Sequence, residues 1–374
     1  MRVHVVDPAA YTPPYDHALC AALAATGLDV RLLTSHFAYG PVAEPAGYAR
    51  EELFYRWARG PANSRLRRAS KLAEHVPDML AYRRRARSAD LVHFQWLAVQ
   101  HVDAHLLPRG RPLVLTAHDV LPREPRPGQL AAQRRLFDHF DAVVVHSAHG
   151  ARRLVDELGL AADRVHVIAH GVLDHLVDRP SRPLPAELAG VRRPVVLCFG
   201  LIRPYKGIDV LLEAWDPAWE AELWIVGMPR MEIGPLVAGA PANVRFVSRF
   251  VGDDELGAFF RRADVVVLPY REIDQSGVLF TALAFGKPLV LSDVGGFSEV
   301  GAGVLVAPGD PAALRVALDG VLGDPAQRER LAGESRAAAS GRFSWASAAR
   351  ETRALYETLC PGAAASGGAT VGSV

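Results

Sequence analysis

The sequence predicts an α/β protein of two domains, each a doubly wound (Rossmann-like) parallel sheet with helices on both faces. Short runs of Val, Leu and Ile alternate along the chain with segments of helical periodicity. The 374 residues are enough for two such units. Three prolines within residues 178–185 interrupt the alternation near the middle and mark a linker, because proline ends both helices and strands.

Each expected strand is a nearly continuous apolar run, as in strands buried on both faces of a parallel sheet. The first half holds expected strands at 3–6, 30–33, 91–94, 113–116, 142–146 and 165–168, and helices at 16–26, 129–140 and 147–158. The second half holds expected strands at 195–199, 223–226, 244–247, 265–268, 289–291 and 304–306, and helices at 208–215, 253–262, 277–285 and 311–322. We therefore expect domains at 1–180 and 190–342, a helix within 343–360 and a flexible Gly/Ala/Ser-rich tail at 361–374.

Composition excludes several classes of protein. A net charge of +1 argues against a nucleic-acid binder. The three cysteines are far apart and form no CxxC pair, which excludes a disulfide framework and favours a reducing compartment. No apolar run approaches the roughly 18 residues that span a bilayer, and the first residues lack the apolar core of a signal peptide. We expect a cytoplasmic protein.

The first group of chemically informative residues follows the strand that ends at Gly200. The loop carries Arg203 and Lys206, and Gly207 then opens a helix. Ligands of parallel sheets bind beyond the carboxyl ends of the strands, and two cations there suit a diphosphate. The alternative is a pair of solvated loop cations. Neither GxGxxG nor GxxxxGK[ST] occurs here.

The second group follows the expected strand at 265–268. Ser276 stands where a helix N-cap is expected, and Gly277 leaves room for a phosphate close to the first free amides of that helix. The alternative for Ser276 is a simple helix cap.

These stretches resemble, in order, the nucleotide-sugar domain of retaining GT-B glycosyltransferases of family 4 (glycosyl transferases group 1). The matching residues are Phe-Gly-Leu-Ile-Arg-Pro-Tyr-Lys-Gly at 199–207, Ala-Asp-Val-Val-Val-Leu-Pro-Tyr at 263–270, Gly-Lys-Pro at 286–288, Asp-Val-Gly-Gly at 293–296, Gly-Val-Leu-Val-Ala-Pro at 303–308 and Phe-Ser-Trp at 343–345. The first half matches more loosely, at 90–94, 116–119, 145–147 and 167–171.

The resemblance implies a fold, an activity and a set of residue roles. The fold is GT-B, with two domains facing across a cleft and the helix around Trp345 crossing back to the first domain. The activity is transfer of a sugar from a nucleotide-diphosphate donor to an acceptor hydroxyl, with retention of configuration. Arg203 and Lys206 would stabilise the departing diphosphate, and His118 would lie near the anomeric carbon. The implied donor-binding residues are Gly200, Arg203, Lys206, Arg249, Phe250, Val251, Gln275, Ser276, Gly277, Val278 and Thr281.

The chain departs from the family pattern where two glutamates eight residues apart are usual. Counting back from Gly286 places them on Ile273 and Thr281, and neither is acidic. Glu272 and Asp274 flank the first position. The Gln-Ser-Gly segment at 275–277 resembles a segment that some branches of the family have at this place. We therefore interpret the chain as a variant enzyme rather than an inactive relative.

The acceptor side is less clearly marked. The loop after the first strand lacks the usual Gly-Gly pair but offers Tyr15 and Asp16, and Asp119 follows His118. Tyr15 suits stacking on a sugar or packing in the core. Asp16 is expected as a helix N-cap, with an acceptor contact as the alternative. The acceptor is expected to be a lipid-linked glycan, a polysaccharide precursor or a small natural product.

Residues 56–87 hold ten basic side chains against Glu74 and Asp78, beside apolar residues at helical spacing. A basic amphipathic helix can lie on an anionic membrane, which would make the protein peripheral on the inner face. The alternative is a solvated arginine-rich face.

No cofactor or metal is expected. HExxH and Asp-x-Asp are absent, and His146 and His149, which straddle a strand end, are expected at the surface rather than as ligands. Two further function classes stay open: a sugar-nucleotide epimerase of similar shape, which needs cleft carboxylates and no acceptor, and a non-catalytic nucleotide-sugar or membrane-binding relative.

Overall fold

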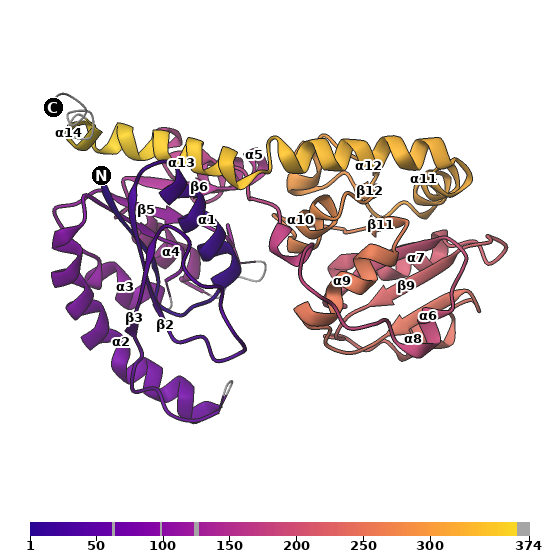
Figure 1. Ribbon diagram of the computed structural model, residues 1–374, viewed down its shortest axis with the longest axis horizontal. Coiled ribbons are helices and arrows are strands. Elements are labelled where there is room, and N and C mark those ends of the chain that lie inside the picture. Colours follow the sequence, from indigo (N-terminus) through magenta and orange to yellow (C-terminus); the bar gives the residue numbers. More distant parts are fainter. Residues whose placement is uncertain (62–63, 98, 123–126, 365–374) are drawn as a thin grey trace, which may run out of the picture. The chain divides into compact units, whose positions relative to one another are not determined.

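The computed structural model describes residues 1–61, 64–97, 99–122 and 127–364 (Figure 1). The chain forms two compact units. The first consists of Met1–Gly171 together with the C-terminal segment from Trp345, and the second is Val172–Ser344.

The first unit is built on a parallel sheet of strand order β3-β2-β1-β4-β5-β6-β7. Neighbouring residues of a strand face opposite sides, so Val5 and Val6 of β1 belong to two separate cores. Helices α1 and α13 cover the face of Val5, and α2 to α5 cover the face of Val6. The elements are β1 Arg2–Asp7, α1 Pro13–Ala25, β2 Asp29–Ser35, β3 Ala49–Phe54, α2 Arg65–Arg85, β4 Leu91–Phe94, α3 Gln100–Leu106, β5 Leu113–Thr116, α4 Gln129–Phe137, β6 Ala142–Val145, α5 Ala148–Asp156, β7 Val165–Val167, α13 Trp345–Leu359 and α14 Pro361–Ala364.

The second unit repeats the architecture with a parallel sheet of order β10-β9-β8-β11-β12-β13. Strands β8, β9, β11 and β12 are buried along their whole length, as nearly continuous apolar strands require. The elements are α6 Ala186–Ala189, β8 Val195–Phe199, α7 Ile208–Ala214, β9 Glu222–Val226, α8 Gly234–Ala238, β10 Val244–Val247, α9 Asp253–Arg262, β11 Val265–Leu268, α10 Gly277–Ala284, β12 Leu289–Ser292, β13 Val304–Val306, α11 Pro311–Gly323 and α12 Pro325–Ser340.

The last long helix, α13, belongs to the first unit and runs beside α1 (Figure 1). At its start the Trp345 ring meets the Tyr15 ring edge-on, 5.0 Å between centroids. A Cβ on Gly171 would lie 2.3 Å from the same indole, so only glycine fits there. Further along, the Tyr356 hydroxyl lies 2.6 Å from His93 Nδ1. These contacts fix the C-terminal helix on the first sheet.

The predicted α/β class, two doubly wound parallel sheets, is confirmed. Several details differ from expectation. The unit boundary follows Gly171 instead of lying near 180, since residues after it bond within the second unit: Leu173 N donates to Phe280 O, and Arg261 donates to Val177 O. Part of the expected tail, Pro361–Ala364, is helical, and 365–374 lie outside the described residues. No helix in the described ranges is both long enough and apolar enough to cross a membrane.

Candidate active site

The predicted diphosphate loops come from adjacent strands of the second sheet. β8 pairs directly with β11, so the loops after Phe199 and Leu268 emerge side by side at the carboxyl edge. Gly207 has a left-handed φ of +65°, and a Cβ there would lie 2.0 Å from the Pro269 carbonyl oxygen. Only glycine allows this approach of the two loops. The bidentate ion pair of Arg271 with Asp209, at 2.8 and 2.6 Å, ties the β11 loop to the start of α7.

Lys206 is the centre of this site. Its side chain is 6% exposed, and its Nζ donates to the Tyr270 hydroxyl at 2.5 Å. The same Nζ lies 4.3 Å from the centroid of the Tyr270 ring, a cation–π distance. The Tyr270 hydroxyl is in turn 3.4 Å from Ser276 Oγ. The chain Lys206–Tyr270–Ser276 therefore joins the two groups of residues that the sequence singled out separately.

Gly200 and Val278 complete the surroundings of this lysine. A Cβ on Gly200 would lie 3.0 Å from Lys206 Nζ and 3.2 Å from Val278 Cγ2. The backbone of the β8 loop, the ammonium and the first turn of α10 thus converge on one point. Arg203 stands on the same loop, and its exposed guanidinium has no hydrogen bond or ion pair to any described residue.

The N-terminus of α10 lies beside the lysine. Ser276 occupies the expected N-cap position in extended conformation, but its side chain makes no capping hydrogen bond. The first amides of a helix have no partner within it, so this end carries partial positive charge. The Thr281 hydroxyl, which replaces a family glutamate, donates to Gly277 O at 2.9 Å. Gln275 Oε1 is buried without a hydrogen-bond partner among the described residues.

Three predicted donor residues lie elsewhere on the same edge. Arg249, Phe250 and Val251 follow β10, which is separated from β8 by β9. Arg249 forms an ion pair with Glu255 at 2.6 Å, and the Phe250 side chain is 66% exposed. The structure brings these residues to the predicted edge, and none of the described contacts joins them to Lys206. Ile273 is buried, whereas Glu272 beside it is exposed.

The first unit gathers histidines at the corresponding edge of its sheet. His93 lies within β4. His118 follows β5, His146 follows β6 and His170 follows β7. The ring centroids of His118 and His146 are 5.3 Å apart, and those of His146 and His170 are 5.1 Å apart. Burial is the main reason why all four pKa values are lowered, to about 3 for His93 and His170 and about 4 for His146. The expectation that His146 is a surface residue is wrong, because its side chain is 5% exposed.

His118 itself is partly exposed and closely held. The Trp96 ring stacks on it at 4.9 Å with an interplanar angle of 12°, and Tyr15 meets it edge-on at 4.7 Å. Its Nε2 is 3.2 Å from Gln95 Oε1, and its Nδ1 is 3.4 Å from His146 Nε2. Asp119, the next residue, is exposed. Sequence reasoning missed Trp96 and Gln95, although their position directly after a buried strand was a signal.

Tyr15 and Asp16 are both deeply buried. The expected capping role of Asp16 is wrong: Thr12 is the N-cap, and Asp16 lies in the first turn of α1. Its carboxyl is hydrogen-bonded to Asp7, whose own oxygens accept the amides of Ala9 and Tyr11. Burial, followed by the neighbouring Asp7 charge, raises the pKa of Asp16 well above its ordinary value. Burial of the pair thus favours the protonated form of Asp16.

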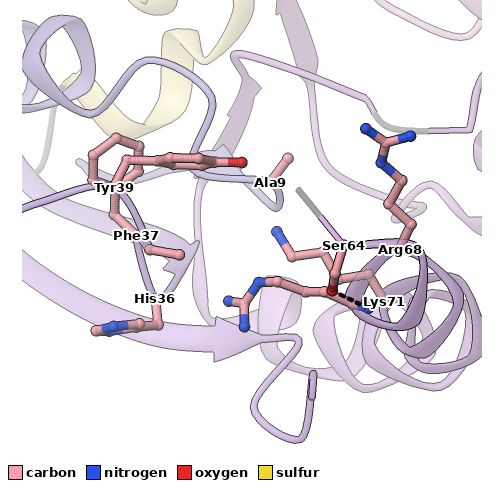
Figure 2. A pocket seen from close by; sticks show the side chains of 9 residues that line it. Ala9, His36, Phe37, Tyr39, Ser64, Arg68 and Lys71 are labelled. Carbon is pink, nitrogen blue, oxygen red and sulfur yellow. Dashed lines mark hydrogen bonds between the residues drawn. The ribbon is translucent and has the colours of Figure 1, made fainter. Parts of the chain in front are cut away.

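A basic pocket lies at the carboxyl edge of the first sheet, the edge that also carries the histidines. It is formed between the loop after β2 and the start of α2 (Figure 2). Figure 2 shows His36, Phe37 and Tyr39 on one side and Ser64, Arg68 and Lys71 on the other. The pocket has a volume of about 140 Å³, and its lining contains Arg67, Arg68 and Lys71 but no carboxylate. Burial, and then the Arg67 charge, lower the pKa of Lys71. Like charges held together this way suit an anionic ligand.

The comparisons with known proteins match this architecture along most of the chain. The family model described as glycosyl transferases group 1 matches residues 193–324, and that of glycosyltransferase family 4 matches residues 15–174. The D-inositol 3-phosphate glycosyltransferase of Xylanimonas cellulosilytica is 32% identical over 287 residues, which cover 70% of this chain and 68% of that protein. That of Frankia alni is 30% identical over 311 residues, covering 74% and 76%.

Solved structures give the same fold. Sucrose-phosphate synthase from Thermosynechococcus elongatus superposes with a TM-score of 0.72 at 22% identity, covering 96% of this chain and 99% of that one. Anabaena HepE, solved with UDP-glucose, gives a TM-score of 0.69 at 19% identity, covering 96% and 100%. The fold, the family models and the curated relatives thus define a glycosyltransferase of GT-B type. This chain belongs to glycosyltransferase family 4, the group 1 glycosyl transferases.

Proposed function

We propose that this glycosyltransferase uses a nucleoside diphosphate sugar and transfers the sugar, with retention, to an acceptor hydroxyl without a metal ion. The observation that carries the proposal is the buried Lys206, placed with Tyr270 and Ser276 at the N-terminus of α10. A buried ammonium beside free helix amides is a fixed positive site for a diphosphate. HepE, a structural relative, was solved with UDP and with UDP-glucose, so uridine is the first base to test.

The chemistry we assign to these groups is stabilisation of the leaving diphosphate. As the bond to the anomeric carbon breaks, negative charge grows on the phosphate oxygens. Lys206, Arg203 and the amides of Gly277 and Val278 supply positive charge that needs no reorganisation during the reaction. Phe250 and its neighbours would contact the base, and Gln275 offers a buried amide to the donor. His118 would contact the transferred sugar, and Tyr15 and Asp119 stay candidates for the acceptor.

The donor proposal is tested by thermal unfolding with UDP, GDP, ADP and dTDP. A nucleotide at 100 times its dissociation constant adds about 2.7 kcal/mol to the stability of the folded state. We expect one nucleotide to stabilise the wild type and Arg203→Ala to lose that response. Arg330→Ala is the matched control, because Arg330 is an exposed arginine of the same unit whose one ion pair among the described residues is with Glu334. Equal responses of the two variants would place the diphosphate elsewhere.

For the acceptor we propose a hydroxyl compound that bears a phosphate or carboxylate, bound in the basic pocket of Figure 2. Arg67 donates to Ala58 O at 3.3 Å, and Lys71 Nζ lies 4.9 Å from the centroid of the Tyr55 ring. The exposed guanidinium of Arg68 has no hydrogen bond or ion pair to a described residue and is the cation most available to a ligand. The names of the relatives from Xylanimonas and Frankia specify a phosphorylated cyclitol as acceptor, which agrees with such a pocket.

The acceptor proposal is tested with D-inositol 3-phosphate and inositol as acceptors. We expect transfer to the phosphorylated compound only, and a raised acceptor KM in Arg68→Gln. The control is Arg65→Gln, which removes the same charge from the same helix but does not line the pocket. Equal use of inositol and its phosphate would overturn the role of the pocket.

We also propose that α2 lies on an anionic membrane surface. Leu66 and Leu72 are each 62% exposed, and Val76 and Leu80 are 40% and 42% exposed. The carboxylates of Glu74 and Asp78 are turned to the adjoining loop, where they accept the amides of Trp57 and Tyr55. The outer face of α2 is therefore apolar, with arginines at both ends, as interfacial helices are.

Vesicle sedimentation tests this surface. We expect pelleting with anionic vesicles, release by salt, and little pelleting with neutral ones. Leu72→Gln should weaken it, whereas Val316→Gln, at an even more exposed apolar position of the second unit, should not. Equal pelleting with both vesicle types would refute the proposal.

A further inference from the structure

We infer that His146 is a positioning residue that fixes the tautomer of His118, so that His118 presents the lone pair of Nε2 to a substrate hydroxyl. The inference rests on the proposed contact of His118 with substrate. It assigns a task to a histidine that neither the family motif nor the donor site explains.

The argument begins at the backbone. His146 Nδ1 is 2.9 Å from the Ile168 carbonyl oxygen, which can only accept. The proton of a neutral His146 ring must therefore be on Nδ1, and its Nε2 carries a lone pair. That Nε2 faces His118 Nδ1 at 3.4 Å. The only arrangement that makes this contact a hydrogen bond places a proton on His118 Nδ1.

Both rings are neutral near pH 7, because of what surrounds them. The groups around them are aromatic or histidine rings: Tyr15 from α1, Trp96 after β4, His93 within β4 and His170 after β7. No carboxylate among the described residues is hydrogen-bonded to either ring. Without a counter-charge, burial favours the uncharged form. Each ring therefore has one N–H, and a proton on Nδ1 leaves Nε2 of His118 as an acceptor.

Gln95 lies at the other ring nitrogen of His118 and can be oriented to agree with the same tautomer. Its Oε1 lies 3.2 Å from His118 Nε2, while its own Nε2 is buried without a partner among the described residues. The two ends of a side-chain amide have nearly the same shape. Exchanging them gives the Gln95 amide nitrogen an acceptor, the lone pair of His118. Without substrate the relay then runs from Gln95 to His118, from His118 to His146 and from His146 to Ile168. A substrate hydroxyl would replace the Gln95 amide at the single lone pair of His118 Nε2.

The consequence for catalysis is selectivity for the group that His118 meets. An imidazole that shows a lone pair accepts from a hydroxyl and repels a carbonyl or phosphate oxygen. The stacked Trp96 ring holds the imidazole plane, so the lone pair has a fixed direction. A sugar hydroxyl fits this requirement.

Histidine-selective ¹⁵N NMR of the whole protein tests the tautomer directly, with the His118 signals assigned by their loss in His118→Phe. We expect Nδ1–H in the wild type. His146→Gln keeps an acceptor near the position of Nε2 and should preserve that tautomer. His146→Leu removes the acceptor and should move His118 toward Nε2–H. His170→Leu is the control, because His170 belongs to the same cluster and bonds to Gly171 O rather than to His118.

Kinetics of the same variants separate this inference from the proposed function. We expect kcat to fall about 10- to 100-fold in His146→Leu, with recovery in His146→Gln and little change in donor KM. Nε2–H in the wild type, or an unchanged tautomer in His146→Leu, would overturn the relay. A shifted tautomer with unchanged kcat would retain the relay and overturn its role in catalysis. Absence of transfer by the wild type would affect only the proposed function.

Discussion

Replacing Lys206 by methionine removes the positive charge at the centre of the donor site while keeping most of the side-chain volume. Lys206 is 6% exposed, and its Nζ is 2.5 Å from the Tyr270 hydroxyl. Interactions aimed at charge that develops in the transition state are worth about 2.7–4 kcal/mol, or about 10²–10³ in kcat. We expect a loss of that size in Lys206→Met. The Tyr270 hydroxyl keeps a neighbour, Ser276 Oγ, at 3.4 Å, so the fold should persist.

The assay is steady-state transfer from the nucleotide sugar that stabilises the wild type, together with thermal unfolding. Lys287→Met is the matched control. Lys287 is a second largely buried lysine of this unit, and its Nζ donates to the carbonyl oxygens of Arg261 and Ala263 at 3.0 and 2.8 Å. Its loss should lower the melting temperature with little effect on kcat. A decrease in kcat of less than about tenfold in a folded Lys206→Met would refute the assignment of leaving-group stabilisation to this residue.

Three further predictions concern the glycine turn, the buried carboxyl pair and the absence of a metal requirement. Gly207→Ala should destabilise the second unit by at least about 1–2 kcal/mol in urea titrations, because φ is +65° and the Pro269 carbonyl occupies the Cβ position. Asp16 has a folded-state pKa above its unfolded value of about 3.9. Its contribution is thus complete below about pH 4 and is lost as pH rises through the folded pKa. Asp16→Asn should therefore flatten the decline of stability with pH above about 4, and an unchanged slope would contradict the raised pKa of Asp16. Transfer should survive excess EDTA at full rate, and restoration of a lost rate by Mg²⁺ would contradict the metal-free site.

The buried strands were predictable, because being covered on both faces leaves a continuous apolar run. Residues 113–116, 195–199 and 265–268 are strands with the expected limits. Strand β3 at Ala49–Phe54 was not expected, since it lies at the sheet edge and only Phe54 is buried. Helix α12 was missed for a similar reason, as only three of its residues, Leu331, Ala332 and Ser335, are buried. An apolar residue pattern shows which elements are buried, so elements with few buried side chains, such as β3 and α12, are hard to recognise in the sequence.

The sequence identified residues of the donor site but not the contacts that join them. Sequence order singled out Lys206 and Ser276, but Tyr270, which joins them, was no more than the last residue of a strand motif. The basic pocket needed three segments around residues 9, 36 and 67, and their meeting depends on β1 and β2 being neighbours. His146 was expected at the surface because it is a polar residue that follows a strand. Only packing against His118 and Ile168 shows that it is buried.

The two units differ in the charge of their candidate site residues, and this difference is related to the absence of the two glutamates expected at positions 273 and 281. In the second unit Asp209 and Glu255 pair with Arg271 and Arg249, while Lys206 donates to the Tyr270 hydroxyl. A glutamate at the position of Thr281 would stand one helical turn after Gly277 and oppose the positive end of α10. The threonine hydroxyl instead donates to Gly277 O and leaves that charge intact. In the first unit the histidines are kept neutral by burial. The fixed positive charge of the second unit suits the proposed diphosphate donor, and the neutral His118 of the first unit suits the proposed contact with a sugar hydroxyl.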